Sequence, residues 1–142
     1  METIDVSIAE TIITLARGAC ICIPTEVERL EGIEDFVNRV GVNWAFFTPS
    51  VARILDPTQM PELKTVLLGE EGTSNEIVSR WSPNRRLINA YGPCEASIWF
   101  SFYELLNEEA DVNNIGIPIP GCKGHIVDPG DANQLLPLWA SS

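Results

Sequence analysis

The sequence has 142 residues, of which 45% are hydrophobic and 20% charged, and 20 Asp and Glu against 9 Lys and Arg give a net charge of −11. This length suits one ordinary domain, and the apolar content excludes a disordered acidic tail. The excess negative charge argues against nucleic-acid backbones and anionic membrane surfaces, so we expect neither as a partner.

The first two expected elements are a helix and a strand. Ile8, Ile12 and Leu15 recur at helical spacing, which predicts an amphipathic helix over Val6–Leu15 that buries this stripe. Ala19–Ile23 is a short apolar run that a proline stops, which predicts a buried strand.

Helices and strands then continue to alternate. A helix is expected over Leu30–Val40, closed by Gly41, and is followed by a strand over Val42–Phe47. Thr48-Pro49 is a capping hydroxyl followed by the residue best suited to the first helical position, so a short helix begins there.

The next segments extend this pattern. Thr65–Leu68 and Arg86–Ala90 are expected strands, and between them Thr73-Ser74-Asn75-Glu76 has the spacing of a capping box that opens a helix through about Arg80. Strands separated by helices are joined most economically by right-handed crossovers. The fold class is therefore α/β, with a mainly parallel sheet and flanking helices.

The pattern changes in the last third of the chain. Trp99–Tyr103 is an expected aromatic strand, and an acidic loop and a turn-rich segment over Ile115–Pro120 follow it. Lys123–Val127 is one more short expected strand, before Asp128-Pro129-Gly130 turns the chain.

The cysteines bear on the cellular compartment. Cys20, Cys22, Cys94 and Cys122 are thinly spread, as small core thiols are in a reducing compartment, and Cys20-x-Cys22 has no second Cys/His pair at zinc-like spacing. Arg17 interrupts the longest apolar stretch, so we expect neither a signal peptide nor a membrane span. These features favour a cytoplasmic location.

The most informative segment is Asn89-Ala90-Tyr91-Gly92-Pro93-Cys94-Glu95, which directly follows an expected strand. Open parallel sheets bind ligands beyond such carboxyl ends. The segment resembles the Asn-x-Tyr-Gly-Pro-Thr-Glu motif of the adenylate-forming superfamily, and within it the adenylation domains of fungal-type nonribosomal peptide synthetases.

Three further segments resemble that family in the correct order. Asp5–Glu10 is similar to its Phe-Asp-x-Ser motif, Val42–Leu55 to its strand and Thr-Pro-Ser helix, and Leu67–Glu71 to its Leu-Leu-Gly-Gly-Glu turn. The likeness spans nearly the whole chain. It implies a ligase that joins an amino acid to ATP, forming an aminoacyl adenylate and pyrophosphate in secondary-metabolite synthesis.

The resemblance also implies site residues. Glu95 would act in catalysis as a ligand of Mg²⁺, and Asp5 would accept the α-amino group of the substrate. Tyr91 would lie against the adenine of ATP and Asn89 would bond its amino edge. The other residues that would bind the nucleotide are Gly69, Glu70, Glu71, Gly92 and Cys94.

The same resemblance lines the side-chain pocket with small or apolar residues, namely Val6, Ala9, Phe46, Leu67, Gly69, Ala90, Ile98 and Trp99. A pocket without a charged wall cannot match a charged side chain, so we expect an apolar or aromatic amino acid. A carrier-protein domain of a longer synthetase is a further implied partner.

Each assignment has a purely structural alternative. Asp5 suits a helix N-cap, and Glu95 a first-turn carboxylate that the helix dipole favours. Tyr91 suits a half-buried aromatic and Asn89 a turn. Cys94 as a nucleophile has little support, because the only histidine, His125, is far along the chain.

The chain departs from the family pattern at the nucleotide. Glu70 replaces a glycine, and Cys94 replaces a threonine whose hydroxyl is expected to face the phosphate. The phosphate loop and the small carboxyl-terminal subdomain with its lysine are not recognisable. We therefore expect residues 1–142 to be the central part of the large amino-terminal subdomain of an AMP-binding domain, inactive alone. An acyl- or aryl-CoA ligase fragment and a noncatalytic interaction module are the alternatives.

Overall fold

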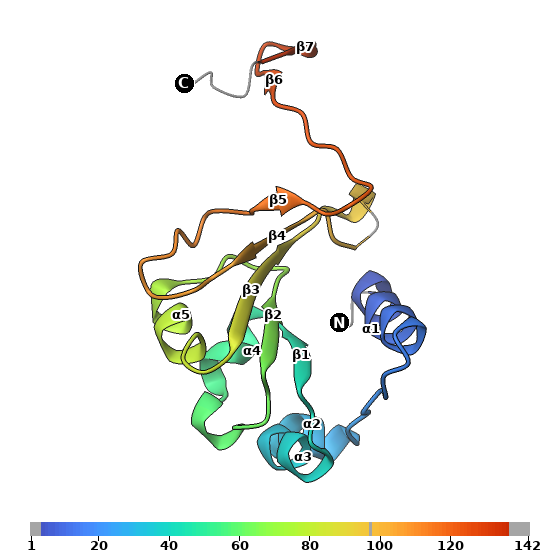
Figure 1. Cartoon of the computed structure of the whole chain (residues 1–142), viewed down its shortest axis with the longest axis vertical. Helices are drawn as coiled ribbons and strands as arrows, with labels where there is room; N and C mark the ends of the chain where they lie inside the picture. Colours follow the sequence, from blue (N-terminus) through green and yellow to red (C-terminus); the bar gives the residue numbers. More distant parts are fainter. Residues whose placement is uncertain (1–3, 97, 137–142) are drawn as a thin grey trace.

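A five-stranded sheet with the order β1-β2-β3-β4-β5 organises the chain (Figure 1). The computed structural model describes residues 4–96 and 98–136. The first three strands are parallel to one another. The fourth strand runs antiparallel to the third, and the fifth runs antiparallel to the fourth. The strands are β1 (Trp44–Phe47), β2 (Thr65–Leu68), β3 (Arg86–Tyr91), β4 (Ser101–Glu104) and β5 (Ile117–Pro118).

Short helices connect the parallel strands. The helix α4 (Pro49–Ile54) and the 3₁₀ turn η1 (Pro57–Gln59) lead from β1 to β2, and α5 (Asn75–Trp81) leads from β2 to β3. The Thr48 hydroxyl caps α4 by accepting a hydrogen bond from the Val51 amide. Ser74 caps α5, so the predicted capping residue, Thr73, is wrong by one position.

The core lies between one face of the sheet and the helices α3 (Ile33–Val40), α4 and α5. Trp81 is fully buried there; its Nε1 donates to the Ala52 carbonyl at 2.9 Å, and its ring meets Phe47 edge-on at 5.8 Å. Arg80 donates to the carbonyls of Arg53 and Leu55. These bonds satisfy carbonyls that the end of α4 leaves open.

The segment before α3 contains two errors of prediction. The single helix expected over Leu30–Val40 is two helices, α2 (Glu26–Glu31) and α3, because Gly32 interrupts the helix. Ala19–Ile23 is not a strand: it has no strand partner among the described residues, and Ile23 is 81% exposed.

The helix α1 (Ile4–Ala16) confirms the first predicted element but not its orientation. Ala9 is buried, whereas Ile8, Ile12 and Leu15 are 50%, 61% and 58% exposed. The predicted stripe therefore faces solvent. Figure 1 shows α1 beside β1, away from α4 and α5.

The carboxyl-terminal part is an arm that carries a hairpin of β6 (Val127–Asp128) and β7 (Asp131–Leu135). The predicted turn at Asp128-Pro129-Gly130 is confirmed, but the expected strand over Lys123–Val127 is reduced to its last residue, and β7 was not predicted. In Figure 1 the arm projects away from the sheet. No helix within the described residues has the length and apolar character that a bilayer crossing needs.

Candidate functional site

An apolar cluster forms where the parallel strands end, on the sheet face opposite the core helices. Side chains alternate along each strand; because Val66 and Leu68 belong to the core, Leu67 faces the other way. The strand register aligns Phe46 with Leu67, and the Phe46 ring lies 6.2 Å from the ring of Trp99. These three residues are among those predicted to line the amino-acid pocket.

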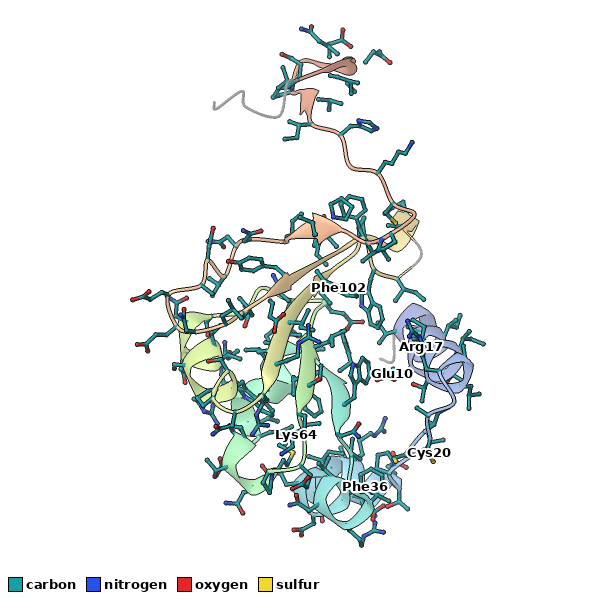
Figure 2. All side chains as sticks on the ribbon, viewed as in Figure 1. Glu10, Arg17, Cys20, Phe36, Lys64 and Phe102 are labelled. Carbon is teal, nitrogen blue, oxygen red and sulfur yellow. The ribbon has the colours of Figure 1, made fainter. Side chains whose placement is uncertain are left out.

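Gly69 and Ala90 complete this cluster. A Cβ atom on Gly69 would lie 2.8 Å from the Ala90 carbonyl oxygen and 3.0 Å from Cε2 of Phe46. Both distances are shorter than ordinary contact, so only glycine fits while β2 and β3 approach each other here. The structure thus brings together five of the predicted pocket residues. Figure 2 shows the side chains on this part of the sheet, with Phe102 labelled on β4.

The turn that follows β3 is tight. A Cβ on Gly92 would lie 2.2 Å from the carbonyl oxygen of Ile98 and 2.8 Å from Cα of Trp99. The Phe100 amide donates to the Tyr91 carbonyl at 2.8 Å, which closes the turn. Ile98 has φ of 121°, a strained backbone for a β-branched residue. The packing of the turn therefore fixes where Trp99 lies.

The opposite face of β3 carries the residues predicted to bind the nucleotide. Asn89 is 9% exposed, and its Nδ2 donates to the Asn114 carbonyl at 3.0 Å. Tyr91 follows two residues later on the same face and is 43% exposed. Ser101 pairs with Tyr91 in the sheet, and its buried hydroxyl has no partner among the described residues.

The turn after β2 contains Glu70 and Glu71. Glu70 has φ of 69°, the left-handed conformation that glycine adopts without steric cost. Glu71 accepts hydrogen bonds from the Ser50 amide at 3.1 Å and from its hydroxyl at 2.5 Å. Its carboxylate therefore ties this turn to the first turn of α4, a structural role that the sequence did not predict.

Glu95 is the predicted metal ligand. It is exposed in the single 3₁₀ turn η2 (Cys94–Ala96) that follows Pro93. The described residues contain no group of three or more side chains that could hold a metal ion. One free-standing carboxylate still fits Mg²⁺, which commonly takes one or two protein carboxylates and completes its shell with water and substrate phosphates.

Some predicted residues are not tested by this geometry. The side chains of Asp5 and Cys94 lie outside the described part of the structure. Val6 and Ala9 lie on α1, where Val6 is half-buried and Ala9 is 1% exposed. The hollow at Arg86 and Phe102, about 290 Å³, lies beside the cluster rather than within it.

Three partners of the site were not found from the sequence. Asn114, Ser50 and Ser101 hold or adjoin predicted residues, but the first two act across 25 and 21 positions of the chain. No local spacing links residues so far apart. Only Ser101 could have been noticed in the sequence, because it is a small hydroxyl residue inside an aromatic strand.

Comparison with known proteins shows which family this chain is similar to. The model of the AMP-binding enzyme family matches residues 3–137. Nonribosomal peptide synthetase 8 of Aspergillus fumigatus is 45% identical over 136 residues, which cover 95% of this chain and 2% of that protein. The chain thus spans a very small part of this curated relative.

Solved structures share the fold. PA1221, an NRPS protein containing adenylation and PCP domains, superposes with a TM-score of 0.70 at 21% identity, over 93% of this chain and 28% of that one. The Vibrio cholerae adenylation domain AlmE, in complex with glycyl-adenosine-5'-phosphate, gives a TM-score of 0.64 at 21% identity, over 73% of this chain and 21% of its own. With a family match over nearly its whole length, the chain belongs to the AMP-binding enzymes.

Proposed function

We propose that this chain is the part of a nonribosomal peptide synthetase adenylation domain that holds an amino acid and the adenine of ATP. The alternation of β3 carries the proposal. Ala90 faces the apolar cluster, while Asn89 and Tyr91 face the opposite side. The hydroxyl of Ser101, which has no hydrogen-bond partner among the described residues, lies on that side too. One strand end thus offers an apolar surface and a polar, aromatic surface within three residues.

The proposed reaction is attack of the amino-acid carboxylate on the α-phosphorus of ATP, with pyrophosphate leaving. An anionic nucleophile approaches a polyanion, so positioning and charge neutralisation dominate the barrier. Tyr91 presents a half-exposed ring on which a base can stack. Bound at Glu95, Mg²⁺ would neutralise phosphate charge.

The substrate that we propose is an apolar or aromatic amino acid. Phe46, Leu67, Ala90 and Trp99 supply the walls of the cluster, and none carries a charge. A charged side chain would lose its hydration there without gaining a partner. Asp5 is proposed to accept the substrate's α-amino group, a role that an acyl-CoA ligase would not need.

The wider context is also proposed. We expect residues 1–142 to be the central part of the large subdomain of a longer synthetase. A carrier-protein domain would take up the activated amino acid; the PA1221 structure holds adenylation and PCP domains together. Free cysteines at positions 20, 22 and 122 suit the cytoplasm.

Binding of ATP with Mg²⁺ to the chain tests the proposal. Titration monitored by tryptophan fluorescence should saturate in the wild type, and Tyr91→Ala should weaken binding about tenfold, since base stacking on an aromatic contributes roughly 1–3 kcal/mol. Leu106→Ala, at a residue 74% exposed and outside the site, is the matched control. An absence of saturation in the wild type, or equal binding by all three proteins, contradicts the proposal and favours a noncatalytic module.

A further inference from the structure

Phe102 is an aromatic residue beside the apolar cluster, and the family resemblance assigns no role to it. It lies on β4 (Figure 2), where it pairs with Ala90 of β3, so both side chains are on the sheet face that carries the cluster. The centroid of its ring is 5.5 Å from that of Trp99, at an interplanar angle of 58°. This distance is typical of aromatic pairs in direct contact. Phe102 therefore contacts one of the residues predicted to line the amino-acid pocket.

Trp99 lies between two phenylalanines that belong to distant strands. Phe46 is on β1 and Phe102 on β4, with β2 and β3 between them. Neighbouring strands are about 4.8 Å apart, so β1 and β4 are separated by roughly 14 Å. The indole of Trp99 bridges them, because its centroid is 6.2 Å from that of Phe46 and 5.5 Å from that of Phe102. We call Phe46, Trp99 and Phe102 the aromatic row.

The two strands beneath the row leave room for the indole. At the level of Phe102, β3 carries Ala90, and the chain that leaves β2 has Gly69. Neither has a side-chain atom beyond Cβ. The close approach of Gly92 fixes the Cα of Trp99, but rotation about the side-chain bonds can still move the ring. The contacts with the two phenylalanines therefore orient the indole.

We infer that Phe102 is a positioning residue of the proposed amino-acid site: its ring holds the indole of Trp99 against Phe46 and thereby limits the size of the substrate side chain. This deepens the proposed function and rests on it, because Trp99 is a wall of a substrate pocket only if an amino acid binds there. Rings 6.2 Å apart touch each other, so no substrate ring fits between Phe46 and Trp99. The site therefore favours a small apolar amino acid over an aromatic one.

Phe102 also borders free space. Together with residues of β3 and β5 it lines the hollow of about 290 Å³, whereas Trp99 does not, so the Phe102 ring lies between the indole and this space. A shorter side chain at position 102 would let the indole move towards the hollow and away from Phe46. The gap that opens between Phe46 and Trp99 would then accept a larger substrate side chain.

Proton NMR of the chain tests the positioning without any ligand. In the wild type, nuclear Overhauser contacts should join the indole of Trp99 to the rings of both Phe46 and Phe102. Phe102→Leu removes the ring and should abolish the contacts between Trp99 and Phe46, whereas Phe102→Tyr keeps a ring and should retain them. Tyr103→Leu is the matched control, because Tyr103 packs against the core on the other face of β4.

Calorimetric titrations with L-valine and L-phenylalanine test the selectivity. The wild type should bind L-valine more tightly. Phe102→Leu should shift the ratio of the two dissociation constants about threefold to tenfold towards L-phenylalanine, the change expected when one aromatic contact is lost. Phe102→Tyr and Tyr103→Leu should keep the wild-type ratio, because a general loss of stability weakens the binding of both amino acids alike. Phe102→Met removes the ring but keeps much of its volume, so it supplies the same comparison if Phe102→Leu does not fold.

Several results overturn the inference. The first is a wild type without contacts between Trp99 and Phe102, and the second is a Phe102→Leu chain in which Trp99 still contacts Phe46. A wild type that prefers L-phenylalanine, an unchanged ratio in Phe102→Leu, or an equal shift in Tyr103→Leu also contradicts it. A wild type that binds neither amino acid contradicts the proposed function instead, and the NMR contacts then still decide whether Phe102 holds Trp99 in place.

Discussion

Gly92→Ala should loosen the turn on which the candidate site is built. The new Cβ would lie 2.2 Å from the Ile98 carbonyl oxygen and 2.8 Å from Cα of Trp99. An ordinary contact between carbon and a carbonyl oxygen is about 3.3 Å, so the two backbone segments must separate by roughly 1 Å. The Ile98 oxygen and the Trp99 Cα are both backbone atoms, so no side-chain rotation can relieve the clash.

The expected cost follows from these contacts. Overpacking of this kind costs about 3 kcal/mol, and the smaller backbone entropy of unfolded alanine returns about 0.5–1 kcal/mol, leaving roughly 2 kcal/mol. With a urea m-value of about 2 kcal/mol/M, the unfolding midpoint should fall by about 1 M. Tryptophan fluorescence follows the unfolding transition.

Gly72→Ala is the matched control for this substitution. No atom lies within 4 Å of the Cβ that it would add, so its midpoint should equal or slightly exceed that of the wild type. If Gly92→Ala unfolds at the same urea concentration as Gly72→Ala, β3 and the residues before β4 do not approach as closely as described. The positions of Tyr91 and Trp99 would then need another explanation.

Further outcomes are expected at three positions. Trp81→Phe should lower the unfolding free energy by about 1–3 kcal/mol in urea, because the Ala52 carbonyl loses its 2.9 Å donor in the core; unchanged stability contradicts this. The hydrogen bonds from the Arg86 guanidinium hold the pKa of Glu104 below its ordinary value of 4.5. The stability that this pair contributes is therefore present above about pH 4.5 and is lost as the pH falls through the lowered pKa. Glu104→Gln should therefore lose less stability than the wild type between about pH 5 and pH 3, as measured by urea titrations at each pH. Glu70→Gly should tighten ATP binding in a fluorescence titration, because it removes a negative charge beside the proposed adenine site. Glycine also adopts the backbone φ of 69° at this position without steric cost. Weaker ATP binding by the variant would show that the Glu70 side chain contributes to nucleotide binding.

The elements that local chemistry determines were predictable. Thr65–Leu68 is β2 with the predicted bounds, and the Thr48-Pro49 signal marks the start of α4. Both depend on neighbours in sequence: a β-branched apolar run in one case, and a cap with a preset φ in the other. The one-residue error at Thr73 has a local cause too, because two adjacent hydroxyls competed for the cap.

The elements that distant partners determine were not predictable. Ala19–Ile23 has the pattern of a strand, yet a strand forms only where another strand accepts its hydrogen bonds. The stripe on α1 shows the same limitation: helical spacing identified the stripe of Ile8 and Ile12 but not what covers it. In both cases apolar side chains that the sequence predicted to be buried are exposed in the structure.

The candidate site likewise has one part that local sequence determines and another that distant partners determine. The order of Asn89, Ala90 and Tyr91 on β3 follows from strand periodicity once the strand is located. The bond from Asn89 to the Asn114 carbonyl joins positions 25 residues apart, and no motif announces it. The motif therefore predicted where the candidate site lies, while the loop that holds Asn89 became visible only in the structure.

The two faces of β3 are under different constraints, and this explains how the fold tolerates the departures from the family pattern. Glu70 adopts a left-handed backbone at the end of β2, where the family motif has glycine, and its side chain adds negative charge beside the proposed nucleotide site. The apolar face depends instead on the close approach of Gly69 to Ala90 and Phe46 and on the ring contact between Phe46 and Trp99. Because side chains alternate strictly, a slip of one residue in β3 would exchange the two faces and destroy both surfaces. We therefore expect a substitution beside the strand end to change ATP binding at the proposed site while the sheet and the apolar cluster persist. A change in the register of β3 would disrupt both surfaces.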